Sequence, residues 1–146
     1  MTKTFDMQFM RYMNIFARGT GIIAKHCFSY NNTIVFVVPR PMIQKAIGQN
    51  NYNLKKLSEI IGKRIRILGQ PTGMKDLQIF VSTLVSPIEF EKIEVINNPE
   101  TRSSEAIITT GGRESKAMLI GRDRAREKEL KDILEQYFEI KNVRIN

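Results

Sequence analysis

The feature that most constrains the fold of this chain is a turn that occurs twice. Ile47-Gly48 and Ile120-Gly121 each lead from a short apolar segment, through polar residues, into an amphipathic basic segment. The two glycines are 73 residues apart in a chain of 146 residues. Self-similarity at a fixed spacing indicates a duplicated structural unit. The chain is therefore expected to contain the same helix–turn–helix twice.

The patterns around the two turns predict the same order of elements in both halves. Apolar residues at helical spacing indicate helices, and alternation with a period of two indicates strands. The first half is expected to contain a helix over 4–18, strands over 22–30 and 33–38, a short helix before Gly48, a longer helix closed by Gly62 and a strand over 64–67. The second half is expected to contain a helix over 77–84, strands over 90–96 and 105–110 separated by a polar loop over 97–104, a short helix over 117–120, a longer helix through Phe138 and a strand over 143–145. Because the strand over 33–38 is apolar on both faces, it is expected to lie at the centre of its sheet.

A boundary between the two halves is predicted at Gln70-Pro71-Thr72-Gly73, where residues typical of turns are clustered. The expected domains are residues 1–70 and 74–146, joined by a linker over 70–73. Helices and strands alternate in both halves, so the predicted fold class is α+β.

The charge is unevenly divided between the halves. The whole chain has a net charge of +8 and a pI of about 9.8, so a polyanion is the first partner to consider. Residues 1–73 contain 11 Lys+Arg and 2 Asp+Glu, whereas residues 74–146 contain 12 and 13, giving net charges of +9 and −1. A basic surface also suits an acidic membrane or serves solubility alone. The two halves are not expected to contribute equally to binding an anion.

The composition argues against several classes of protein. A single cysteine, Cys27, excludes an intrachain disulfide and fits a reducing cytosol, and one cysteine with one histidine makes a zinc site improbable. No apolar run approaches the ~20 residues that span a bilayer, and the N-terminus has no signal-peptide pattern. No paired carboxylates at helical spacing accompany a histidine, so we expect no catalytic site, no metal and no cofactor. The protein is expected to be soluble and cytoplasmic, without a membrane partner.

A glycine between two helices has a clear use in binding nucleic acid. Without a side chain, Gly48 lets a phosphate backbone approach the protein closely. The N–H groups at the start of the next helix then point at a phosphate. For one such turn, a simple connection between helices with solvated lysines is the better interpretation. The repeat and the basic first half favour binding.

Several segments resemble the KH RNA-binding domain, whose signature is I-G-x-x-G between two helices. They are Ala46-Ile47-Gly48, the run from Leu57 to Lys63, Phe80 to Pro87 and Phe138 to Val143. The resemblance covers nearly the whole chain. It implies two tandem KH domains of the prokaryotic type (type II), each a three-stranded sheet with helices on one face. Two such domains in tandem resemble the archaeal form of NusA, a family of transcription factors.

The chain departs from the KH pattern at the closing glycine of both turns. Asn51 stands there in the first turn and Arg124 in the second. Asparagine tolerates left-handed φ values and caps helices well, whereas arginine tolerates them less readily. Asp123 also places a carboxylate where a phosphate would approach. Phosphate binding is therefore predicted to be stronger at the first turn.

The resemblance implies a set of RNA-binding residues in and beside the two turns. They are Lys45, Ile47, Gly48, Gln49, Asn50, Asn51, Lys55 and Lys56 in the first half, and Gly121, Arg122, Asp123, Arg124 and Arg126 in the second. In the second half, a solvated surface balanced by acidic residues is as good an interpretation as RNA binding.

The resemblance also implies a function. It is a non-catalytic, monomeric protein that captures single-stranded nascent RNA during transcription elongation or termination, with RNA polymerase or other transcription proteins as further partners. The alternative is an adaptor that docks on RNA polymerase or the ribosome and binds RNA only weakly.

Overall fold

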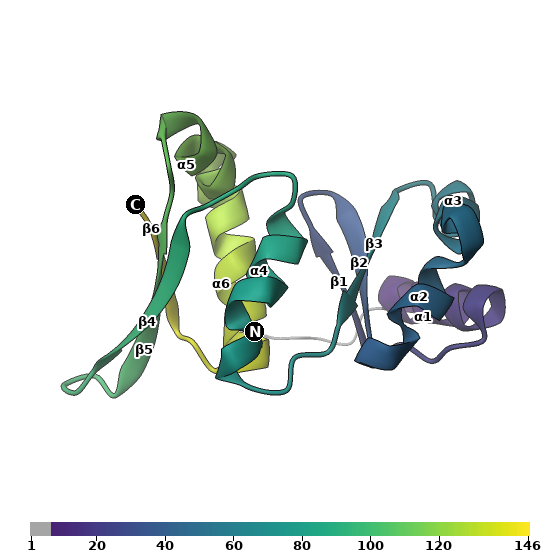
Figure 1. The fold of residues 1–146 in the computed structure, drawn as a ribbon, viewed down its shortest axis with the longest axis horizontal. Helices are drawn as coiled ribbons and strands as arrows, with labels where there is room; N and C mark the ends of the chain where they lie inside the picture. The colour runs from purple at the N-terminus through teal and green to yellow at the C-terminus, as the bar shows by residue number, and fades with distance from the viewer. Residues whose placement is uncertain (1–6) are drawn as a thin grey trace. The chain divides into compact units, whose positions relative to one another are not determined.

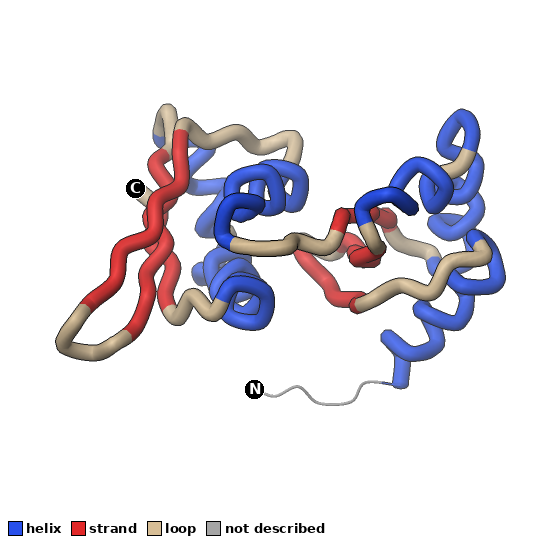
Figure 2. The backbone as a smooth tube through the Cα atoms, turned by 60° about the horizontal axis from the view of Figure 1, so that its bottom comes forward, coloured by secondary structure: helices blue, strands red, loops and turns tan. Residues whose placement is uncertain are grey.

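The computed structural model describes residues 7–146 and contains two compact units, Met1–Gln70 and Pro71–Asn146. In its described part, each unit has one three-stranded mixed sheet and three α-helices (Figure 1). Within each unit, the helices cover one face of the sheet (Figure 2).

The first unit contains helices and strands in the order α-β-β-α-α-β. The elements are α1 (Met7–Thr20), β1 (His26–Tyr30), β2 (Thr33–Val38), α2 (Ile43–Ile47), α3 (Tyr52–Ile61) and β3 (Arg64–Gly69). Strand β2 lies at the centre, antiparallel to β1 and parallel to β3, and Thr33 pairs with Arg64. A parallel pair needs a crossover, and α2, the glycine turn and α3 together form it.

The core of the first unit lies between its sheet and its helices. Alternate residues of β2 join this core because successive side chains of a strand point to opposite faces. Phe36 of β2 stacks on Phe16 of α1, with ring centroids 4.4 Å apart, and both side chains are fully buried. Leu57 brings α3 into the same cluster. This packing holds α2 and α3 against the sheet and thereby positions the turn between them.

The second unit repeats the order and the strand directions of the first. The elements are α4 (Leu77–Val85), β4 (Lys92–Asn98), β5 (Ser103–Thr109), α5 (Arg113–Ile120), α6 (Ala125–Phe138) and β6 (Asn142–Ile145). Strand β5 lies at the centre, antiparallel to β4 and parallel to β6. Phe80 of α4 packs edge-on against Phe138 of α6, with ring centroids 5.4 Å apart.

The α+β class, the order of elements in both halves and the central position of 33–38 are confirmed. All six residues of β2 are buried. Of the predicted helix over 4–18, residues 4–6 lie outside the described part of the chain. The rest is helical, but α1 continues to Thr20 and ends at Gly21, where φ is 75°.

The predicted strand over 22–30 is wrong in its first four residues, since β1 begins at His26. The central strand β2 ends at Val38, before Pro39. The last hydrogen bond to it from this side is donated by the Lys25 N–H to the Val37 carbonyl oxygen, at 2.7 Å. Residues 22–24 therefore have no strand to pair with. Burial alternates along residues 22–24 because this connecting segment packs on the core, not because it pairs with a strand.

The predicted polar loop over 97–104 is too long, since only residues 99–102 lie between the strands. Strands β4 and β5 continue into it, and Ser103 pairs with Asn98. The Ser104 hydroxyl donates to Asn97 Oδ1 at 2.8 Å, so polar side chains support a ladder that hydrophobicity does not reveal. The helix predicted over 117–120 begins earlier, at Arg113. Hydrophobic periodicity did not reveal its first turn, because the residues there are polar.

No helix in the described residues is both long enough and apolar enough to cross a bilayer.

The packing of Phe36 generates a prediction about stability. Replacing Phe36 with alanine removes a fully buried ring and leaves a cavity beside Phe16. We expect the free energy of unfolding to fall by about 3–5 kcal/mol, measured by urea denaturation followed by circular dichroism. The control Ile23→Ala, at a side chain that is 81% exposed, should change it by less than about 0.5 kcal/mol. Equal effects of the two substitutions would contradict the assigned core.

Candidate functional site

The turn between α2 and α3 has an unusual backbone. Helix α2 ends at Gly48, whose φ is 81° and ψ is 165°. Asn50 and Asn51 then both adopt left-handed conformations, with φ values of 55° and 61°. The Gly48 N–H donates to the Gln44 carbonyl oxygen at 3.0 Å, and the Asn51 N–H donates to the Gly48 carbonyl oxygen at 3.2 Å. These two bonds close the turn so that α3 begins directly after it.

Position 48 requires glycine for two reasons. Its positive φ is strained for any residue with a side chain. A Cβ atom there would also lie 3.0 Å from the backbone nitrogen of Asn53, closer than ordinary packing allows. Asn53 supports the approach, because its Nδ2 donates to the Lys45 carbonyl oxygen at 3.2 Å and joins α3 to the end of α2.

The turn between α5 and α6 has nearly the same backbone. Gly121 has φ 77° and ψ 171°, and Asp123 and Arg124 follow with left-handed φ values of 55° and 62°. The Gly121 and Arg124 N–H groups make the equivalent bonds, to Ala117 at 2.9 Å and to Gly121 at 3.2 Å. Arginine therefore adopts the conformation that its side chain disfavours, and the second turn keeps its shape without a closing glycine.

The two turns differ in their charges. Beside the first turn, the ammonium groups of Lys45, Lys55 and Lys56 are exposed, and none forms an ion pair with a described residue. The turn residues themselves, from Gln49 to Asn51, are uncharged and exposed. The first turn thus presents uncharged turn residues, with positive charges beside them that no described carboxylate pairs with.

At the second turn, most of the positive charge is paired with glutamates of α6. Arg124 Nη1 lies 2.9 Å from Glu127 Oε1, and Arg126 Nη1 lies 2.9 Å from Glu129 Oε1. Exposed Asp123 adds a carboxylate at the tip, where Asn50 stands in the first turn. Exposed Arg122 is the remaining cation of the turn. Similar backbones therefore carry different electrostatic surfaces.

The structure brings most of the predicted site residues together around each turn. Ile47 is the exception, because its side chain is half-buried and packs against the core of the first unit. Lys45 precedes the first turn on α2, and Lys55 and Lys56 follow it on α3. Arg126 lies in the first turn of α6, directly beside Gly121.

Two residues beside the first turn were not among the sequence predictions. Tyr52 and Asn53 begin α3 and line a shallow pocket of about 390 Å³ together with Gly48, Gln49 and Asn50. Tyr52 is 60% exposed. An aromatic residue directly after a polar turn was the available signal, but helical spacing alone did not show on which side of α3 it lies.

Cys27 and His26 lie on β1. Burial raises the pKa of the Cys27 thiol to about 12, so the sulfur is protonated at neutral pH. Burial, with a smaller effect of Lys25, lowers the pKa of His26. Among residues 7–146, no group of three His, Cys, Asp or Glu side chains is arranged to hold a metal ion.

The chain resembles known proteins in sequence and in fold. No protein-family model matches the chain. Over 83 residues, 57% of the chain, it is 31% identical to the "Probable transcription termination protein NusA" of Methanococcus vannielii. The chain spans about half of that curated relative, since the match covers 46% of its length. The chain thus has a distant and partial relation to an archaeal NusA.

A solved structure matches nearly the whole chain. The crystal structure of APE1850 superimposes with a TM-score of 0.67 at 25% sequence identity. The superposition covers 97% of this chain and 100% of that one. The fold of this chain is therefore found in a second protein.

The close approach at the two glycines predicts similar sensitivity to added side chains. Gly48→Ala and Gly121→Ala each place a Cβ on a left-handed backbone within about 3 Å of a neighbouring backbone nitrogen. Each substitution is expected to lower the free energy of unfolding by about 1–3 kcal/mol, measured by thermal denaturation. Gly112→Ala is the control, because its backbone is extended and no atom lies within 4 Å of the added Cβ. Destabilisation by Gly112→Ala as large as by the other two would contradict this explanation.

Proposed function

We propose that the chain is a non-catalytic protein of two tandem KH domains of type II that binds single-stranded RNA during transcription. The first turn, from Gly48 to Asn51, holds the RNA backbone, and bases lie in the groove beside it, with about four nucleotides per domain. The relation to a protein named for transcription termination supports a role in elongation or termination.

The observation that carries the proposal is the repeated turn geometry. In each turn a glycine is followed by two consecutive left-handed residues at the start of a helix. Backbone N–H groups of a turn can form a concave anion site, and a helix N-terminus adds a favourable dipole. At the first turn, the uncompensated charges of Lys45, Lys55 and Lys56 attract a phosphate to that site.

The two domains contribute unequally in this proposal. A phosphate that approaches the second turn meets the carboxylate of Asp123 and arginines that are already paired with Glu127 and Glu129. The second domain therefore binds RNA weakly or serves mainly as scaffold.

The ion pairs of the second turn also favour an alternative, in which the protein is an adaptor that docks on RNA polymerase or the ribosome. An adaptor would be retained by purified RNA polymerase after RNase treatment. A protein held through RNA would be released. If RNA forms the link, the Asn50→Asp variant, which places a carboxylate at the first turn, should be released from the polymerase as RNase treatment releases the wild type.

Asn50→Asp tests the first turn with little strain. Asn50 is exposed and left-handed, a conformation that aspartate also tolerates, and the substitution copies Asp123 of the second turn. We expect binding of short single-stranded RNA, measured by fluorescence anisotropy, to weaken by roughly three- to tenfold because a carboxylate meets the phosphate.

Asn32→Asp is the matched control, since Asn32 is also exposed and left-handed and lies in the β1–β2 turn of the same unit. It makes the same change of charge away from the site and should leave the affinity nearly unchanged. Equal weakening of RNA binding by both variants would show that the effect comes from net charge alone. If Asn50→Asp does not weaken binding, the proposed site is overturned.

Glu127→Gln tests whether RNA reaches the second turn. The substitution releases Arg124 from its ion pair. If RNA passes this turn, affinity for RNA of roughly 12 nucleotides should rise about two- to fivefold, and the salt slope should steepen by up to ~0.7. Glu135→Gln is the control, because Glu135 pairs with Lys141 near the other end of α6. No rise with Glu127→Gln, or an equal rise with both variants, would leave the second domain as scaffold.

A further inference from the structure

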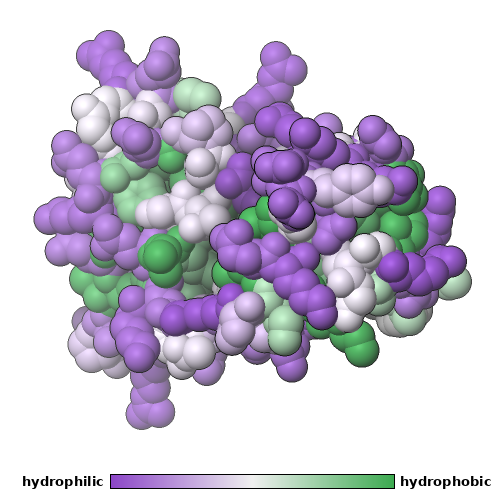
Figure 3. Space-filling model, turned by 45° about the vertical axis from the view of Figure 1, so that its right-hand side comes forward, coloured by the Kyte–Doolittle hydropathy of each residue, from purple (hydrophilic) through white to green (hydrophobic). Residues whose placement is uncertain are grey.

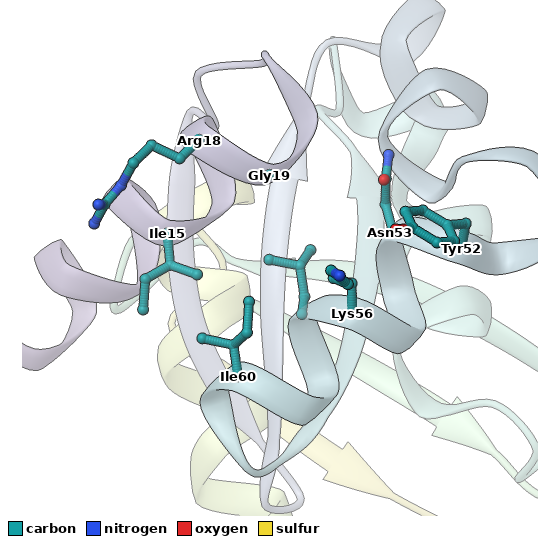
Figure 4. A pocket seen from close by; sticks show the side chains of 8 residues that line it. Ile15, Arg18, Gly19, Tyr52, Asn53, Lys56 and Ile60 are labelled. Carbon is teal, nitrogen blue, oxygen red and sulfur yellow. The ribbon is translucent and has the colours of Figure 1, made fainter.

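A second concave surface lies beside the first turn, between α1 and α3. It has a volume of about 480 Å³. Figure 4 shows Ile15 of α1 and Ile60 of α3 directed toward the space between the two helices. Leu57, which is buried, also lines it, and Ile60 is 57% exposed. The volume is within the range of about 300–1,000 Å³ that small ligands occupy in proteins.

The groove shares two lining residues with the pocket at the first turn. Tyr52 and Asn53 line both. The exposed ring of Tyr52 stands where α3 begins, and Lys56 Nζ lies 5.7 Å from the centroid of that ring. A strand held at Gly48–Asn51 would therefore meet an aromatic ring and an ammonium group as it leaves the turn toward α1.

The charges around the groove suit an anion. Arg18 of α1 and Lys56 of α3 are its charged lining residues, and neither forms an ion pair with a described residue. Glu59 is the only acidic residue in the sequence between positions 7 and 70, and it does not line the groove. Figure 3 shows hydrophobic patches among hydrophilic side chains on one face of the molecule.

We propose that the groove between α1 and α3 is a further nucleotide subsite for the RNA strand held at the first turn. One base stacks on Tyr52, the face of a following base rests against Ile60, and Arg18 and Lys56 hold the adjoining phosphates. An exposed aromatic ring beside cations is the combination that binds single strands without reading their sequence. A protein helix without acidic residues would use the apolar floor but would leave both cations without partners. This subsite rests on the proposed RNA-binding function.

The test compares two RNA lengths by fluorescence anisotropy, one of about four nucleotides, which the turn alone accommodates, and one of roughly eight. Tyr52→Ala should weaken binding of the longer RNA about fivefold or more, with little effect on the shorter one. Tyr52→Phe should retain the affinity, because the ring remains. Arg18→Gln, which changes a residue of the groove alone, should lower the salt slope for the longer RNA by ~0.7.

Ile23→Ala is the control, since this exposed apolar residue of the same unit lines neither pocket. A 2-aminopurine base in the longer RNA should lose fluorescence through stacking with the wild type and with Tyr52→Phe, but not with Tyr52→Ala. Equal loss of both RNAs in Tyr52→Ala would assign Tyr52 to the turn itself and overturn the subsite. If Tyr52→Ala binds the longer RNA as tightly as the wild type, the subsite is also overturned, and a protein is then the occupant to test. If the wild type binds neither RNA, the proposed function itself fails.

Discussion

The candidate site depends on one close approach between backbone atoms. At Gly48, the chain leaves α2 with a positive φ and passes so near the Asn53 nitrogen that a Cβ would collide with it. This approach lets α3 begin immediately after the turn, with its first N–H groups beside Asn50 and Asn51. The parallel pairing of β2 with β3, and the packing of Leu57 into the core, hold both helices in place. The position of the proposed anion site thus follows from the crossover that the sheet requires.

Repetition of this geometry separates the role of the backbone from that of the side chains. Gly48 and Gly121 have similar φ and ψ values, and the hydrogen bonds that close the two turns agree within about 0.1 Å. The backbone therefore has the form of the proposed anion site in both units. The surrounding charges then determine its use, because Arg124 and Arg126 are paired at the second turn. A duplicated fold can in this way keep one strong site while the other copy serves a different purpose.

The sequence predicted those parts of the structure that depend on hydrophobic periodicity and on glycine. The order of elements, the central strand and the place of both turns followed from these signals. It missed the ends of β4 and β5, where polar pairs such as Ser104 with Asn97 extend the ladder. It also missed the left-handed Arg124, because the local preference of arginine is overridden by the two helices that the turn joins. Tyr52 was missed because the groove that it lines also needs residues of α1, which lies far from Tyr52 in sequence.

The most direct test of this account is a titration of the 15N-labelled protein with a short single-stranded RNA, followed by the backbone amide signals of both turns. The amide signals from Gly48 to Asn53 are expected to shift first and most. Those from Gly121 to Arg126 should shift less and at higher RNA concentration, and those of buried β2 should change little. Shifts at the second turn alone, or equal shifts at both turns at the same RNA concentration, would contradict the claim that charge pairing distinguishes two turns of similar backbone.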